Sequence, residues 1–183
     1  MRGSTVGGWA LIVGAGCFAL FWSLALTSLD ESVATGPSRP ATAAWLPALA
    51  LHATTIASLT IGLGLLARDL RRAREARLVA TLGAALTVVG LITVFPLIPV
   101  GLGLVAIGLM GVRYPRAATG SLLVGSVGMV ILYVALYQQQ AGRVFGEGAP
   151  PFQLGPKLIF QASVILLAAG LAAIGFQLRR RNE

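Results

Sequence analysis

The sequence predicts an all-α polytopic membrane protein with six transmembrane helices, and its composition and the spacing of its charges carry this prediction. Hydrophobic residues make up 56% of the 183 residues and charged residues only 11%, with a mean hydropathy of +0.84. A soluble domain carries about 25% charged residues to cover its surface. The charges lie in short clusters between long apolar runs, which excludes a soluble globular domain, a disordered chain and a coiled coil.

The first two apolar runs are each long enough to cross a bilayer, which takes about 20 apolar residues. The first covers residues 7–28 and is followed by the acidic pair Asp30 and Glu31. The second covers residues 44–67 and is followed by Arg68. Both are predicted to be helices, because a backbone group without a hydrogen-bond partner in lipid costs several kcal/mol.

The next two runs, 78–95 and 97–112, follow each other almost without a gap. As one helix these 35 residues would be about 52 Å long, whereas the hydrocarbon core is about 30 Å thick. Pro96 and Pro99 lie near the middle, and prolines in this position break a helix. We therefore expect a tight hairpin on the outer side of the membrane. One steep, kinked helix is the alternative.

The last two runs cover residues 117–137 and 158–178. Three glutamines follow the first of them and three arginines follow the second, and both groups mark a return to water. We therefore interpret residues 1–183 as a single transmembrane domain of six helices.

The distribution of basic residues predicts the orientation. With the N-terminus in the cytoplasm, the cytoplasmic segments are 1–6, 68–77, 113–116 and 179–183, and together they hold eleven of the 14 basic residues. The outer segments hold the other three, which are Arg39, Arg143 and Lys157. This asymmetry agrees with the positive-inside rule. It predicts cytoplasmic N- and C-termini, and the preference for arginine over lysine suggests a prokaryotic cell inner membrane.

The net charge of +8 does not indicate nucleic acid binding, because the basic residues lie at the ends of apolar segments. There they set the topology and contact the anionic headgroups of the lipid bilayer. The cytoplasmic loop 68–77 resembles a helical extension and is the strongest candidate for contact with anionic lipid or with a soluble partner. Its basic residues are Arg68, Arg71, Arg72, Arg74 and Arg77. The alternative is that this loop only sets the topology.

The predicted spans contain no Asp, Glu, Lys or Arg, with Lys157 counted as a flank of the sixth. Ionisable residues inside a membrane mark proton relays, ion pathways and voltage sensors. Their absence argues against a proton pump, a carboxylate-gated antiporter and a voltage sensor. No set of nucleophile, base and acid is apparent either. We expect no catalytic residue, no metal site and no enzymatic activity of the chain by itself.

His52 is the only histidine, so a haem held by two histidines of one chain is excluded. A single axial bond to haem or chlorophyll, or a hydrogen bond to a quinone, remains open. The alternative is a histidine that bonds to a neighbouring helix or to interfacial water. The sequence requires no cofactor.

Four uncharged polar residues are predicted to lie a turn or two below the outer surface: His52, Tyr133, Tyr137 and Gln161. Their imidazole, phenol and amide groups donate and accept hydrogen bonds without bringing a fixed charge into lipid. If they converge, they suit a quinone headgroup, a neutral solute or one face of a porphyrin. The alternative is an interfacial belt in which each side chain meets a different neighbour.

Two functions are compatible with these features. The first is a non-catalytic accessory or structural subunit of a larger membrane assembly, or a homo-oligomer, because small residues recur at the four-residue spacing that favours helix packing. The second is a small permease or a membrane protein that binds a solute or quinone on the outer side. A subunit co-purifies with a stoichiometric partner, whereas a permease binds or moves solute alone in liposomes.

The predicted topology is tested with reporter fusions after residues 36, 73, 97, 115, 147 and 183. We expect them to alternate between outside and inside, with residue 36 outside, because eleven of the 14 basic residues lie in the segments assigned to the cytoplasm. An outside signal at residue 115 would exclude the hairpin between the third and fourth runs.

Overall fold

The computed structural model describes most of the backbone and the side chains of the helical spans. The backbone is described for residues 2–35, 42–70, 73–93, 95–112, 114–144 and 154–180. Side chains are described for residues 5–25, 46–70, 73–93, 95–112, 114–134 and 156–180.

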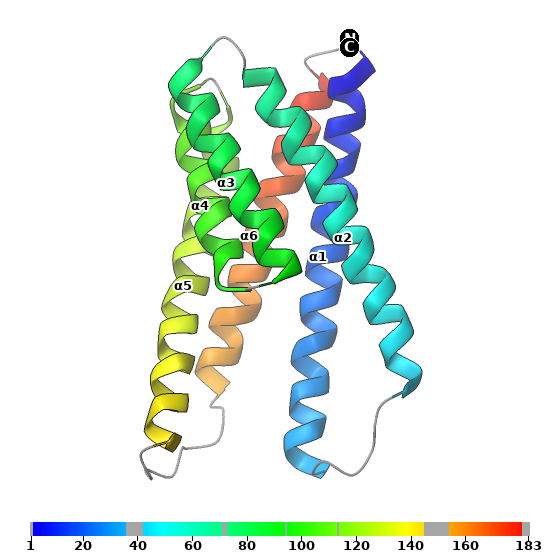
Figure 1. Ribbon diagram of the computed structural model, residues 1–183, viewed down its shortest axis with the longest axis vertical. Coiled ribbons are helices and arrows are strands. Elements are labelled where there is room, and N and C mark those ends of the chain that lie inside the picture. The colour runs from blue at the N-terminus through cyan, green and yellow to red at the C-terminus, as the bar shows by residue number, and fades with distance from the viewer. Residues whose placement is uncertain are drawn as a thin grey trace.

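Within this part of the chain, six α-helices form and no strand, which confirms the all-helical prediction (Figure 1). They are α1 (Arg2–Thr35), α2 (Thr42–Asp69), α3 (Arg74–Ile92), α4 (Leu97–Met110), α5 (Arg116–Val144) and α6 (Leu154–Arg180). Five of them are long and apolar enough to cross a membrane, and α4 is shorter. The protein therefore has the architecture of a multi-pass membrane protein.

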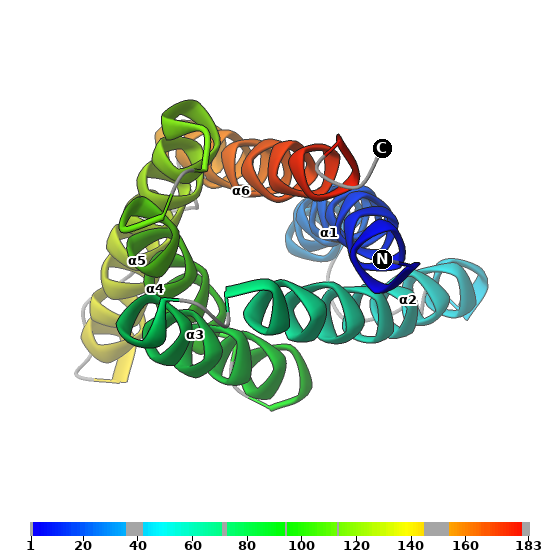
Figure 2. The ribbon, with the colours of Figure 1, turned by 90° about the horizontal axis from the view of Figure 1, so that it is seen from above.

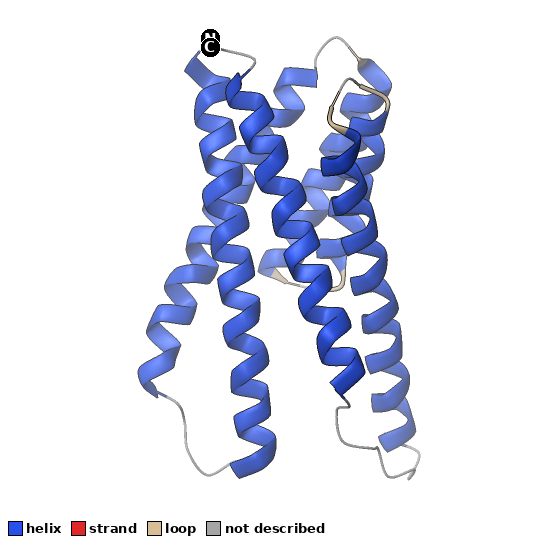
Figure 3. Ribbon diagram, turned by 180° about the vertical axis from the view of Figure 1, so that it is seen from behind, coloured by secondary structure: helices blue, strands red, loops and turns tan. Residues whose placement is uncertain are grey.

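The helices stand side by side in chain order and form a ring that closes where α6 packs against α1 (Figures 1 and 2). Consecutive helices run in opposite directions, so both termini lie at the same end of the bundle, which we call the terminal end. We call the other end the distal end. Seen from behind, α1 and α6 run along each other for most of their length (Figure 3).

The third and fourth apolar runs form two separate helices. α3 ends at Ile92, where the Thr93 N–H donates to the carbonyl oxygen of Val89, and a turn containing Phe95 and Pro96 leads into α4. This turn does not reach the distal end of the bundle, because α1, α2, α5 and α6 all extend beyond it (Figure 1). The α3–α4 hairpin is thus shorter than the helices around it.

Helix ends and apolar run ends do not coincide. α1 continues past the acidic pair to Thr35, and α5 continues past the three glutamines to Val144. The apolar pattern reports where the chain meets lipid, whereas backbone hydrogen bonding also persists in water. The predicted boundaries 7–28 and 117–137 therefore mark parts of longer helices.

The loop 68–77 is not one continuous helical extension. α2 stops at Asp69, the Ala73 N–H donates to the carbonyl oxygen of Leu70 over 3.0 Å, and α3 starts at Arg74. The hydroxyl of Tyr114 donates to Asp69 over 3.3 Å, which ties this turn to the connection between α4 and α5.

Glycines bring two pairs of helices into backbone contact. A Cβ atom added to Gly83 of α3 would lie 2.5 Å from the carbonyl oxygen of Gly101 in α4. A Cβ atom added to Gly8 of α1 would lie 2.5 Å from the carbonyl oxygen of Gly175 in α6. These distances are too short for any side chain, and such close approach is how helices associate in lipid. Glycines therefore hold the α3–α4 hairpin together and close the ring.

Replacement of Gly83 by alanine tests this packing. We expect Gly83→Ala to lower the free energy of unfolding by about 1–3 kcal/mol, because the new methyl group meets backbone atoms that cannot move aside. The measurement is unfolding in mixed detergent micelles followed by circular dichroism. Gly16→Ala is the matched control, since a Cβ atom there has nothing within 4 Å. Equal losses in both variants would contradict the assignment.

Candidate functional site

Three consecutive residues of α1 contact three different parts of the ring. Phe21, Trp22 and Ser23 are about 100° apart around the helix axis, because an α-helix has 3.6 residues per turn. Phe21 meets α2, Trp22 meets the α3–α4 turn and α6, and Ser23 meets α6. One turn of α1 thus connects its neighbours at a single level of the bundle.

His52 of α2 packs between aromatic rings. Its imidazole lies nearly face to face with Phe21, with 4.7 Å between ring centroids and 30° between ring planes. It also meets Phe95 of the α3–α4 turn at 6.2 Å and 66°. His52 therefore takes part in a contact that includes α1, α2 and the hairpin.

Trp22 is the centre of this cluster. Its indole packs edge-to-face against Phe95 at 5.2 Å and against Phe160 at 5.4 Å, and it also contacts Phe18 and Phe21. Each such aromatic pair contributes about 0.5–1.5 kcal/mol beyond the burial of its area. We call these six residues the aromatic layer: Phe18, Phe21, Trp22, His52, Phe95 and Phe160.

A hydrogen bond between helices lies beside the aromatic layer. The Nε2 amide of Gln161 in α6 donates to the hydroxyl oxygen of Ser23 in α1 over 2.9 Å. In lipid such a bond is worth about 0.6 kcal/mol on average and up to about 2 kcal/mol. The bond fixes α6 to α1 one residue away from Trp22.

Several buried polar atoms have no hydrogen-bond partner among the described residues. They are Trp22 Nε1, His52 Nδ1, Tyr133 OH and Ser126 Oγ. Leaving such an atom unpaired costs about 1–3 kcal/mol. Trp22 and His52 both belong to the aromatic layer, so two unpaired nitrogens lie close to the Phe95 ring that both residues contact.

The other two atoms lie on α5. Ser126 is buried beside Gly103 at the contact with α4. Gly128 packs against Ser163 of α6, and because α5 and α6 are antiparallel, Tyr133 lies within about a turn of the level of Phe160. No ring contact joins Tyr133 to the aromatic layer in the described part of the chain.

The four residues predicted to form an outer site are brought together only in part. His52 and Gln161 both contact the 21–23 segment of α1. Gln161 lies seven residues into α6, which begins at Leu154. Tyr133 lies across the ring on α5, and the side chain of Tyr137 falls outside the described residues.

Sequence reasoning did not select the residues that connect this site: Phe21, Trp22, Ser23, Phe95 and Phe160. In an apolar span, the sequence alone does not tell whether a phenylalanine packs against another helix or faces lipid. The one available signal was Trp22, because a tryptophan inside a predicted span needs a hydrogen-bond partner for its N–H.

The basic residues assigned to lipid or partner contact lie at the terminal end. Arg68, Arg74 and Arg77 are exposed there, whereas Arg71 and Arg72 fall outside the described residues. Nearby, the guanidinium carbon of Arg179 lies 4.2 Å from the centroid of the Trp9 ring.

The chemistry available at the site is binding through aromatic faces and uncharged hydrogen-bonding groups. Among the residues that the structure describes, no three His, Cys, Asp or Glu side chains gather in a metal-binding cluster. No protein-family model matches the chain, and no similar curated protein or solved structure is found.

A double-mutant cycle on Ser23 and Gln161 tests the bond beside the aromatic layer. We expect Ser23→Ala and Gln161→Leu to be coupled by about 0.5–2 kcal/mol in the free energy of unfolding, because either change removes the same hydrogen bond. Chemical unfolding in mixed micelles provides the measurement. Ser23→Ala paired with Gln177→Leu, near the other end of α6, is the control and should show no coupling. Additive losses at Ser23 and Gln161 would mean that the bond contributes nothing.

Proposed function

We propose that this chain is a non-catalytic membrane protein that binds a small, uncharged, amphipathic molecule at the aromatic layer. The observation that supports this proposal is the pair of unpaired nitrogens, Trp22 Nε1 and His52 Nδ1, on two side chains that both contact Phe21 and Phe95. Carbonyl or hydroxyl groups of a ligand would satisfy these atoms and recover the cost of leaving them unpaired.

The aromatic rings define the shape of the ligand. Phe21, Phe95 and Phe160 offer apolar faces and edges that suit a planar ring, while the indole N–H donates and a neutral imidazole both donates and accepts. No Asp, Glu, Lys or Arg side chain belongs to the layer, which disfavours an ion. A quinone headgroup has this combination of a flat ring and two carbonyl oxygens.

Access to the layer comes from the distal end. α1 continues for 13 residues beyond Trp22 to Thr35, about 20 Å, whereas the α3–α4 turn stops at the layer (Figure 1). Phe95 in this turn stays 40% exposed. We therefore expect a ligand to approach the rings past Phe95.

The proposal includes the orientation predicted from the charges, with the terminal end in the cytoplasm and the protein in the cell inner membrane of a prokaryote. The distal end then faces outward, and the aromatic layer takes its ligand from the outer side. The role of accessory subunit, which the sequence alone favoured, is the competing function. We place ligand binding first because helix packing alone does not offset the cost of two unpaired nitrogens in one aromatic cluster.

Quenching of Trp22 fluorescence by a short-chain benzoquinone tests this function. In a variant with Trp9→Phe and Trp45→Phe, Trp22 is the only tryptophan, and we expect saturable quenching in nanodiscs. His52→Phe keeps a ring against Phe21 but removes the nitrogens. It should raise Kd about 3- to 10-fold, the value of one hydrogen bond.

The single variant Thr54→Val is the matched control for His52→Phe. The exposed Thr54 hydroxyl already donates to the carbonyl oxygen of Ala50 in its own helix. This variant should leave Kd unchanged. Quenching that rises linearly with quinone, or a Kd unaffected by His52→Phe, would contradict the proposal. A stoichiometric protein partner found on purification, together with unsaturable quenching, would favour the accessory subunit.

A further inference from the structure

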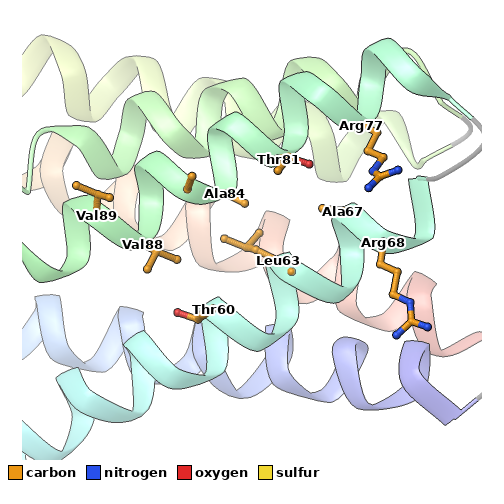
Figure 4. A pocket seen from close by; sticks show the side chains of 11 residues that line it. Thr60, Leu63, Ala67, Arg68, Arg77, Thr81, Ala84, Val88 and Val89 are labelled. Atoms are coloured by element: carbon orange, nitrogen blue, oxygen red, sulfur yellow. The ribbon is translucent and has the colours of Figure 1, made fainter.

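An open groove runs between α2 and α3 on the side of the ring where the two helical hairpins meet (Figure 4). Its volume is about 620 Å³, within the range of about 300–1,000 Å³ typical of small-molecule sites. α2 contributes Thr60, Leu63, Gly64, Ala67 and Arg68, and α3 contributes Arg77, Thr81, Ala84, Ala85, Val88 and Val89.

The groove exists because each helix uses its closest-packing face for its hairpin partner. Gly62 of α2 lies against Leu11 of α1, and Gly83 of α3 lies against Gly101 of α4. The facing surfaces of α2 and α3 carry mainly small and medium-sized side chains, and an open groove remains between them. At Gly64, an added Cβ atom would find nothing within 4 Å.

The groove is apolar along its length and basic at one end. The hydroxyl of Thr60 donates to the carbonyl oxygen of Ile56 over 2.7 Å, so it offers the groove little polarity. Arg68 of α2 and Arg77 of α3 are exposed, and both lie at the terminal end of the groove (Figure 4). No acidic residue is among those that line it. This distribution suits an occupant with an apolar body and an anionic head.

The length of the groove is close to the depth of one leaflet. The groove follows the 13 residues from Arg77 to Val89 of α3, a rise of about 18 Å, and half of the hydrocarbon core is about 15 Å. A transmembrane helix of a partner would have to be covered over the full core of about 30 Å. A single acyl chain occupies only its own leaflet.

We propose that the α2–α3 groove holds an acyl chain of an anionic phospholipid, with the phosphate bound by Arg68 and Arg77. The arginines supply two cations at the level of the headgroups, and guanidinium groups bind phosphate oxygens through paired hydrogen bonds. The lipid comes from the leaflet at the terminal end. This site is separate from the aromatic layer and does not depend on the function proposed for it.

Native mass spectrometry of the full chain tests the headgroup contact, with phosphatidylglycerol and phosphatidylcholine as probes. We expect one phosphatidylglycerol per chain to bind more tightly than phosphatidylcholine. The double variant Arg68→Gln and Arg77→Gln should raise its Kd about 10- to 30-fold, because each arginine near an anionic surface is worth about 1 kcal/mol. Arg180→Gln is the control, an exposed arginine at the same end but outside the groove.

A second variant tests the acyl chain. Gly64→Leu places a side chain in the open part of the groove without changing any charge, and we expect it to weaken phosphatidylglycerol binding at least about 5-fold while the arginines remain. Glycerol phosphate, which has no acyl chain, should bind measurably neither to the unaltered protein nor to Gly64→Leu.

Three results would overturn the lipid proposal. The first is an unchanged Kd in Gly64→Leu, which would mean that the headgroup binds alone. The second is glycerol phosphate binding as tightly as the lipid. The third is a dimer that Gly64→Leu dissociates, which would mean that a second copy fills the groove.

Discussion

The aromatic contact around Trp22 determines how the two ends of the bundle differ. On the terminal side of this level the six helices form a closed ring, with glycines bringing α1 to α6 and α3 to α4 at backbone distance. At this level the α3–α4 hairpin ends, and Phe95 closes against Trp22 and His52. Beyond it, α1, α2, α5 and α6 continue without the hairpin. The indole therefore lies at the level where the bundle changes from six helices to four.

Packing in this protein follows from what lipid leaves available. Without a difference in polarity between lipid tails and leucine, helices gain stability from close approach and from a few hydrogen bonds. α1–α2 and α3–α4 take the close approach, through Gly62 and Gly83. The contact between these two hairpins has neither the close approach nor the hydrogen bonds, and an open groove with two arginines at its end remains there. The groove and the tight hairpins have one cause.

Much of the fold was predictable, since lipid imposes helices on every apolar run and Pro96 marks the break between α3 and α4. The helix ends at Thr35 and Val144 were not predictable, because helical hydrogen bonds continue into water beyond the last apolar residue. The site was predictable in part. His52 stood out as the only histidine, but its partners Phe21 and Phe95 depend on how helices cross, which spacing along one helix does not contain.

The contact of α1 with α6 has a consequence for connectivity. Each helix is followed around the ring by its successor in the chain, and the last helix lies beside the first with both termini at one end. The order of the helices is therefore cyclic, and a short peptide could join the two termini. New termini between α2 and α3, where the connection is a brief turn near Ala73, would begin a circularly permuted chain with the same neighbours throughout. The neighbours of each helix in the ring therefore do not depend on which helix comes first in the chain.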